Sequence, residues 1–181
     1  MALSSEEQRT SELDDVETLM RLYKAKVLRF VAFSLGDRDA AESITHDCLL
    51  KAHASRAQFR GDCSVNSWLM RIAVNLVRNH AQSRRLQFWK KIQNTDNGSM
   101  RECPDRRISP EEHASVRQQV EAVWEATRQL SHKQRTVFLL KYLEELEVKE
   151  IAQSTGMTEN TVKVHLFRAV RNVRKRLGAS R

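Results

Sequence analysis

The sequence has few of the residues that interrupt helices. Its 181 residues include five glycines and two prolines, so breaks between helices are few. Hydrophobic residues make up 40% of the chain, which is typical of a globular rather than a disordered protein. Strand-like alternation of polar and apolar residues does not compete with helical spacing anywhere. We therefore predict an all-α fold.

Long apolar runs are also missing. No stretch approaches the roughly 20 apolar residues that a membrane-spanning helix needs. The N-terminal stretch MALSSEEQRT is polar and acidic, unlike a signal peptide. These features predict a cytoplasmic protein with no membrane insertion.

Cysteine is scarce and irregularly placed. The three cysteines, Cys48, Cys63 and Cys103, are odd in number and widely spaced, which indicates a reducing compartment without a disulfide framework. A metal site is the alternative use of cysteine and histidine, but no CxxC or HxxxH pair supports one. If the protein were an enzyme, its best candidates for reactive groups would be Asp62, Cys63 and His80. These three residues do not form a recognisable set of acid, base and nucleophile. We expect no catalysis, no metal, no cofactor and no small-molecule substrate.

Acidic residues are absent from the C-terminal end. The chain carries 31 Lys and Arg against 23 Asp and Glu, a formal net charge of +8. From Val162 onward there is no acid, and the basic residues are Lys163, Arg168, Arg171, Arg174, Lys175, Arg176 and Arg181. A basic field confined to one face can steer an anionic ligand, so we expect a nucleic-acid partner.

The apolar spacing divides the chain into two groups of helices. It predicts helices over residues 14–35, 39–57, 65–85, 110–130, 131–143, 147–154 and 159–177. Residues 93–110 show no periodic spacing of hydrophobic residues and are rich in Asn, Asp, Gly, Ser and Pro. At the end of this stretch, Ser109 and Pro110 fit the start of a helix. We predict two small helical domains, residues 1–90 and 110–181, joined by a flexible linker over 91–109.

The second domain contains the pattern of a helix-turn-helix. Ala152 is small where two helices would pack, Gly156 tolerates the turn, and Val162 closes the second helix onto the first. The outward face of that helix carries Asn160, Lys163, Val164, Phe167, Arg168 and Arg171. Asn and Arg match the edges of adenine and guanine in the major groove. A solvated basic hairpin is the alternative, but an exposed Phe167 favours DNA binding.

The first domain contains aromatic residues among cations. The stretch from Phe59 to Arg85 has one acid, Asp62, against five arginines, and it also contains the aromatic residues Phe59 and Trp68. Bases stack on aromatic rings while phosphates meet cations, so this pattern is typical of single-stranded nucleic-acid binding. Both rings can also serve as core residues.

Two blocks of the sequence resemble a known family. FRGD…SWLMRIAVN and DAAESITHDCLLKAH resemble domain 2 of the extracytoplasmic-function (ECF, group IV) sigma factors of bacterial RNA polymerase. LSHKQRTVFLLKYLEELEVKEIAQSTGMTENTVKVHLFRAVRNVRKRL resembles their domain 4. The two blocks occur in the family's order and cover most of residues 16–177. The resemblance implies a promoter-specificity subunit that initiates transcription as part of RNA polymerase holoenzyme.

The resemblance also implies site residues and partners. The partners are core RNA polymerase, through its β′ clamp helices and β flap, promoter DNA, and an anti-sigma factor. Domain 2 would melt the −10 element and hold a flipped base with the loop from Phe59 to Ser67 and the helix after it, namely Phe59, Arg60, Gly61, Asp62, Ser67, Trp68, Asn75, Arg78 and Asn79. Domain 4 would read the −35 element with Asn160, Lys163, Val164, Phe167 and Arg168, and with Lys141 on phosphate. The clamp helices would bind Asp39, Glu42, Asp47 and Leu50.

Some positions depart from the family pattern. His46-Asp47 replaces a common Gln-Glu, His53 replaces an aromatic residue, and Val65 and Asn66 replace aromatics of the capture loop. The promoter sequence is therefore not predicted. Phe88 and Trp89 begin the linker and are either an anti-sigma contact or an extension of the first domain's packing. A free-standing helix-turn-helix regulator is the competing function, but it has no use for a melting loop and a polymerase-docking helix.

Overall fold

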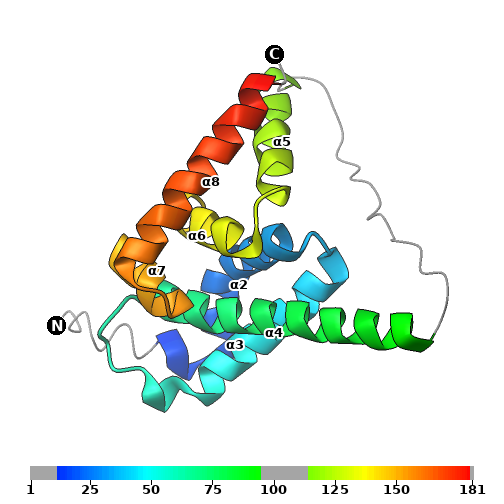
Figure 1. Cartoon of the computed structure of the whole chain (residues 1–181). Coiled ribbons are helices and arrows are strands. Elements are labelled where there is room, and N and C mark those ends of the chain that lie inside the picture. Colours follow the sequence, from blue (N-terminus) through cyan, green and yellow to red (C-terminus); the bar gives the residue numbers. More distant parts are fainter. Residues whose placement is uncertain (1–11, 95–113, 180–181) are drawn as a thin grey trace.

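The computed structural model describes residues 12–94 and 114–179, with side chains described for 12–84 and 121–178. Every regular element in the described ranges is helical (Figure 1). The elements are α2 (Val16–Leu35), α3 (Arg38–Ala54), a 3-10 turn (Arg56–Gln58), α4 (Val65–Asn94), α5 (Ala114–Arg128), α6 (His132–Tyr142), α7 (Val148–Thr155) and α8 (Glu159–Ala179). The all-α prediction is confirmed.

The helices begin and end where local chemistry favours it. The Asp15 carboxylate caps α2 by accepting from the backbone N–H groups of Glu17 and Thr18. Gly36 ends the same helix with φ 69°, a left-handed conformation that glycine adopts without steric cost. Asp37 then caps α3, accepting from the Ala40 N–H. Such side-chain acceptors satisfy N–H groups that have no partner inside the helix.

Within the described ranges, two boundaries differ from the sequence prediction by more than two residues. Helix α3 ends at Ala54 rather than at residue 57, because the chain tightens into the 3-10 turn over the next residues. Helix α4 continues to Asn94, so Phe88 and Trp89 belong to this helix instead of beginning the linker. The predicted helix start at Ser109 and Pro110 lies outside the described residues.

Each group of helices buries apolar side chains. We call α2 to α4 the first lobe and α5 to α8 the second lobe. In the first lobe α2 and α4 both pack against α3, and the largest fully buried side chains include Phe30, Leu49, Leu69 and Met70. In the second lobe α6 and α7 lie at one end of α8, and α5 runs antiparallel beside its other end (Figure 1).

The two lobes are in direct contact. The rings of Phe33 on α2 and Trp124 on α5 stack with their centroids 3.5 Å apart. Helix α7 lies against α4, and Ile151 of α7 shares one continuous core with Leu69 of α4. The domains that the sequence predicts as separate therefore meet across an apolar interface.

Candidate nucleic-acid and polymerase interfaces

Helices α7 and α8 form the helix-turn-helix that the sequence predicts. Gly156 ends α7 with φ 72°, and its N–H bonds to the Ala152 carbonyl. The Thr158 hydroxyl then accepts from the Thr161 N–H at 3.2 Å and caps α8. Ile151 and Val162 are fully buried between the two helices. The turn thus fixes how α8 projects from the lobe.

Helix α8 has one buried and one exposed face. Ala169 is fully buried, and Val162 and Val173 lie with it on the buried side. Phe167 is 68% exposed and Val164 is 47% exposed, an unusual state for large apolar side chains. The exposed face contains Asn160, Lys163, Val164, Phe167 and Arg168. All five predicted recognition residues of this helix are therefore accessible together.

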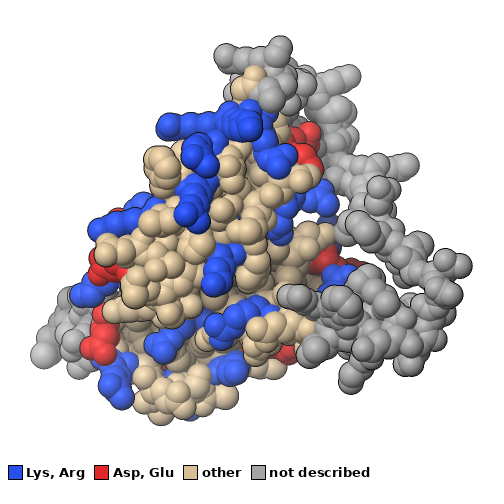
Figure 2. All heavy atoms as spheres, viewed as in Figure 1, with Lys and Arg blue, Asp and Glu red and all other residues tan. Residues whose placement is uncertain are grey.

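Cations lie close to one another around this face. Burial, followed by the charges of Lys133 and Arg168, lowers the pKa of His165. Lys141, predicted to contact phosphate, is half-buried and pairs with the exposed Glu147 carboxylate at 3.3 Å. Figure 2 shows Lys and Arg side chains along α8 and over α4 on the same face of the molecule. Such a face attracts a polyanion.

The predicted capture loop is built around an aromatic pair. The rings of Phe59 and Trp68 lie 5.4 Å apart at an interplanar angle of 57°. Both are half-buried and pack against the core, so each is a core residue with a partly exposed surface. Arg60 and Asp62 are exposed on either side of Gly61, which turns the loop with φ 74°.

Ser67 is held at the beginning of α4. The Ser64 hydroxyl accepts from the Ser67 N–H at 3.1 Å, as a helix cap does. The Ser67 hydroxyl donates to a carboxylate oxygen of Glu150 on α7, in the other lobe. Ser67 is only 3% exposed, so in this arrangement of the lobes it is not accessible to DNA.

The predicted contacts farther along α4 lie on its surface. Arg78 and Asn79 are exposed, and the Arg78 guanidinium donates to the Asn75 side-chain oxygen at 2.8 Å. Burial, then the charge of Arg135, then that of Arg78, lowers the pKa of His132 at the start of α6. Arg78 of α4 and Arg135 of α6 thus both act on His132.

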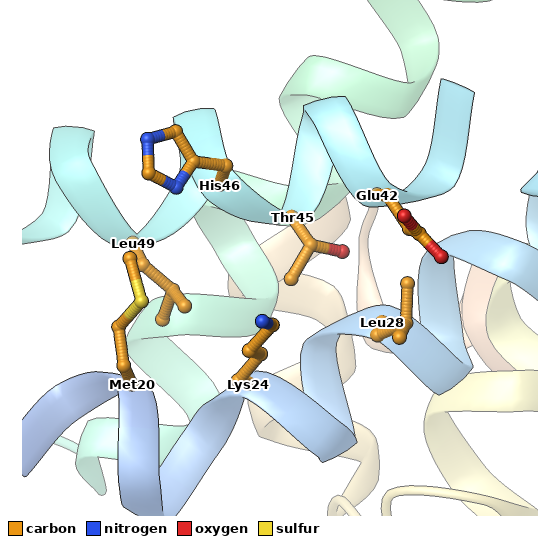
Figure 3. A pocket seen from close by; sticks show the side chains of 7 residues that line it. All are labelled: Met20, Lys24, Leu28, Glu42, Thr45, His46 and Leu49. Carbon is orange, nitrogen blue, oxygen red and sulfur yellow. The ribbon is translucent and has the colours of Figure 1, made fainter. Parts of the chain in front are cut away.

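The predicted polymerase-docking residues share one face of α3. Asp39, Glu42, Asp47 and Leu50 are all exposed, although Glu42 also pairs with Arg38 at 3.3 Å. Beside this face a shallow pocket of about 220 Å³ opens between α2 and α3 (Figure 3). The residues around the pocket are Met20, Lys24, Leu28, Glu42, Thr45, His46 and Leu49. The face offers acidic groups beside a hollow that is lined by both polar and apolar side chains.

Three of the residues that depart from the family pattern, His53, Val65 and Asn66, have defined surroundings in the structure. Nδ1 of His53 lies 3.0 Å from the Leu13 carbonyl and ties α3 to the segment before α2. Val65 is buried at the start of α4. The side-chain oxygen of Asn66 is buried without a hydrogen-bond partner.

No pattern in the sequence predicts the ion pair between Arg29 and Glu144, which connects the lobes. Arg29 on α2 lies 3.3 Å from Glu144, which follows α6 and whose side chain is 1% exposed. Burial raises the pKa of the Glu144 carboxyl, opposed by Arg29, Lys26 and a hydrogen bond from Asn66. The nearest signal in the sequence is the acid-rich stretch EELEVKE, residues 144–150, inside an otherwise basic lobe.

The described cysteines and histidines do not form a metal site. Cys48 is buried with its sulfur 3.7 Å from the Leu69 carbonyl, and burial raises the pKa of its thiol to about 12. Cys103 lies outside the described residues. Within the described ranges no three His, Cys, Asp or Glu residues are placed to hold a metal ion. None of the helices described there is long and apolar enough to cross a membrane.

Comparison with known families gives a match to each lobe. The model for Sigma-70 region 2 matches residues 19–87, and the model for Sigma-70 region 4 matches residues 120–173. The RNA polymerase sigma-H factor of Pseudomonas aeruginosa is 27% identical over 89% of this chain and 85% of its own length. The RNA polymerase sigma factor SigV of Bacillus subtilis is 30% identical over 81% of this chain and 82% of its own.

Solved structures show the same fold. The sigma factor RpoE of Bartonella quintana, in complex with the anti-sigma factor NepR, aligns with a TM-score of 0.71 and 22% identity, covering 93% of this chain and 99% of RpoE. CnrH, in complex with the cytosolic domain of CnrY, aligns with a TM-score of 0.64 and 18% identity, covering 97% of this chain and 96% of CnrH.

Proposed function

The chain belongs to the extracytoplasmic-function sigma factors of the sigma-70 family, and from this premise we propose how its residues divide the work on a promoter. A sigma factor is a non-catalytic initiation factor that acts with core RNA polymerase. We assign the −35 element to the second lobe and the −10 element to the first. The cytoplasm, where polymerase works, is the proposed location.

The assignment of the −35 element rests on the exposed face of α8. Arg168 and Asn160 offer side chains that bond to guanine and adenine edges, while Val164 and Phe167 offer apolar contact for thymine methyl groups. The buried face anchors the helix, because Val162 and Ala169 are fully buried. The proposal rests on this separation between the buried face and the exposed face of α8.

The assignment of the −10 element rests on the capture loop and α4. The partly exposed rings of Phe59 and Trp68 give a base a surface to stack on, and Arg60 gives its phosphate a cation. Asn75 and Asn79 are four residues apart and lie on one side of α4, so they can address neighbouring bases. The two asparagines are the residues that we assign to base edges.

Docking to the β′ clamp helices is assigned to α3. Its exposed acids, Asp39, Glu42 and Asp47, suit a basic partner, and Leu50 is 43% exposed beside them. Complementary charge steers such an encounter and fixes its register. The β flap would bind the second lobe.

We also propose an anti-sigma factor as a regulatory partner. The two structural neighbours described above were solved as complexes, one with the anti-sigma factor NepR and one with the cytosolic domain of CnrY. The shared fold makes this chain suitable for the same kind of partner.

Run-off transcription tests the proposal directly. Core polymerase from the source organism, supplied with this protein and a library of its genomic fragments, should produce transcripts that start at a common promoter motif. Core polymerase alone should produce none of them. Binding of the protein to duplex DNA without any sigma-dependent transcript would contradict the proposal.

A further inference from the structure

A histidine lies at the edge of the exposed face of α8, beside the residues assigned to base reading. The helical repeat places His165 between the exposed side, which contains Arg168, and the buried side, which contains Val162. His165 is half-buried, and its Nδ1 is buried without a hydrogen-bond partner among the described residues. A charged imidazolium needs an acceptor at each ring nitrogen, whereas a neutral ring needs one acceptor fewer. The free protein therefore favours a neutral His165.

The first turn of α6 lies along the same side of α8. Asn172 follows His165 by roughly two helical turns, so both side chains are on one side of the helix. The Asn172 amide donates to the side-chain oxygen of Gln134 on α6 at 3.4 Å. Lys133, the residue before Gln134, is exposed. Helix α6 thus adds a cation to the edge of α8 at which His165 lies.

These surroundings oppose a charge on His165. Burial is the main cause of its lowered pKa, and the charges of Lys133 on α6 and Arg168 on α8 add to the effect. An unperturbed histidine titrates near about pH 6.5. Because the pKa of His165 is below that value, the ring is neutral in the free protein at neutral pH.

No nearby carboxylate offsets this positive charge. Helix α8 packs against α5, α6 and α7, and the acids in the described parts of these four helices are Glu121, Glu125, Glu150 and Glu159. Glu125 pairs with Arg128, Glu150 accepts from Ser67, and the other two are exposed. None of these acids, nor Lys149 of α7, is among the groups that shift the titration of His165. An anion for a charged His165 must then come from a bound partner.

Duplex DNA supplies such an anion at this position. A helix fills the major groove, which is about 12 Å wide, so the centre of its exposed face meets base edges and its two sides meet the backbones. We propose that Lys133 and His165 bind one backbone phosphate of the duplex that α8 reads, and that His165 takes up a proton from solvent as it binds. The inference rests on the proposed function of α8 as the reader of duplex DNA.

Proton uptake makes DNA affinity depend on pH in a defined direction. The phosphate offsets the charges of Lys133 and Arg168, so the pKa of His165 is higher in the complex than in the free protein. The complex then holds more protons than its separate components between the two pKa values. Affinity therefore rises as pH falls through that interval, by about tenfold for each unit that separates the two pKa values.

Binding of the full-length chain to a fluorescein-labelled, mixed-sequence DNA duplex tests the inference, because phosphate contacts need no particular base sequence. Wild-type protein should bind about tenfold more tightly near pH 6 than near pH 8. The slope of log affinity against log salt concentration should also become steeper by about 0.9 at the lower pH, because one more cation engages the backbone.

Substitutions of two histidines assign the proton to one residue. His165→Gln should keep the high-pH affinity and the shallower salt slope at both pH values. His165→Arg, with a permanent charge, should show the steeper slope at both. His132→Gln is the matched control, because burial lowers the pKa of this second-lobe histidine as well. That variant should keep the pH dependence of the wild type.

Lys133→Gln distinguishes a shared phosphate site from a neighbour that only repels His165. Removing this charge should raise the pKa of His165 in the free protein, which NMR of the labelled imidazole measures directly. It should also weaken DNA binding at both pH values, because the phosphate loses a partner. Unchanged affinity near pH 8 would remove Lys133 from the site.

The outcomes separate this inference from the proposed function. If wild-type affinity and salt slope are the same at both pH values, or if His165→Gln keeps their pH dependence, His165 takes up no proton and the inference fails. Loss of the pH dependence in His132→Gln would assign the proton to His132 and would also overturn it. Promoter-specific transcription by the wild type would uphold the proposed function in each of these cases. A chain that binds no duplex at either pH would contradict both the inference and the assignment of the −35 element to α8.

Discussion

Arg168 and Ala169 are neighbours on α8, yet the guanidinium lies in solvent while the methyl group is fully buried. The 3.6-residue helical repeat sends adjacent side chains to different faces. Ala169 therefore helps to fix the helix, and Arg168 is available to DNA. A substitution at an exposed residue such as Arg168 can change which DNA sequence is preferred without changing the stability of the fold.

Arg168→Ala is expected to remove recognition at one promoter position. An arginine bonded to the edge of guanine is worth roughly 1–3 kcal/mol of discrimination against the wrong base. Holoenzyme binding to promoters with each base substituted in turn measures this loss. Arg174→Ala, an exposed arginine farther along α8, serves as the control. Equal weakening on every sequence would identify Arg168 as a phosphate contact and shift base reading to Asn160 and Lys163.

At the scale of elements, the turn between α7 and α8 depends on one backbone conformation. Gly156 has φ 72°, and nothing lies within 4 Å of where a Cβ would be. Gly156→Ala should therefore cost about 1–2 kcal/mol through the left-handed backbone alone. Gly156→Asn should cost less, because asparagine tolerates this conformation. Urea unfolding measures both losses.

A second glycine provides the control for that measurement. Gly178 lies inside α8 without a positive φ and also has open space around it. Gly178→Ala should leave stability unchanged or raise it slightly, because alanine favours a helix. Equal losses at the two glycines would show that the turn geometry is not the cause.

The docking face of α3 also acts as an element, since its acids lie along one side. Asp47→Arg should weaken binding to core polymerase, because a like charge placed at a complementary interface can cost several kcal/mol. Helical content should stay the same, since Asp47 is exposed. Glu125→Arg, an exposed acid of the second lobe, should bind core polymerase as the wild type does. Equal affinity of Asp47→Arg and wild type would remove α3 from the docking site.

Helices of this kind are readily predicted from sequence, because their signals are local and periodic. The spacing of Val162, Ala169 and Val173 predicts the buried face of α8, and Asp15 and Gly36 mark the ends of α2. The apolar spacing does not predict the extension of α4 through Phe88 and Trp89 to Asn94, because polar residues there interrupt the helical repeat. A stretch without a clear period does not exclude a helix.

At the scale of the whole molecule, no local or periodic sequence pattern predicts how the two lobes are arranged. The contact depends on single side chains from separate helices, such as Arg29 with Glu144 and Phe33 with Trp124. Neither pair forms part of a periodic pattern or a motif. An aromatic pair of this kind adds about 0.5–1.5 kcal/mol beyond the area that it buries. A few such contacts determine how the lobes are arranged. In the sequence, each of these residues looks like an ordinary surface or core residue.

The whole molecule must also open promoter DNA, which separates a sigma factor from an ordinary DNA-binding protein. Extruding a base costs a few kcal/mol in lost pairing and stacking. Phe59 is a poor choice for testing the contacts that offset this cost, because its ring packs on the core. Asn75 is half-buried, with its side chain bonded to Arg78, and Asn79 is exposed; neither belongs to the apolar core, so their truncation leaves the core intact.

The variant Asn75→Ala/Asn79→Ala should therefore form holoenzyme and reach promoter duplex through α8, yet fail to open it. Two lost hydrogen bonds of about 1 kcal/mol each lower the open fraction by more than about tenfold. Permanganate reactivity of unpaired thymines measures that fraction, and Gln82→Ala, an exposed change farther along α4, should match the wild type. A pre-melted template should restore most of the transcription, because the strands are already separated. Opening at the wild-type level would instead place base capture in the loop from Phe59 to Asp62 and leave the asparagines as surface residues.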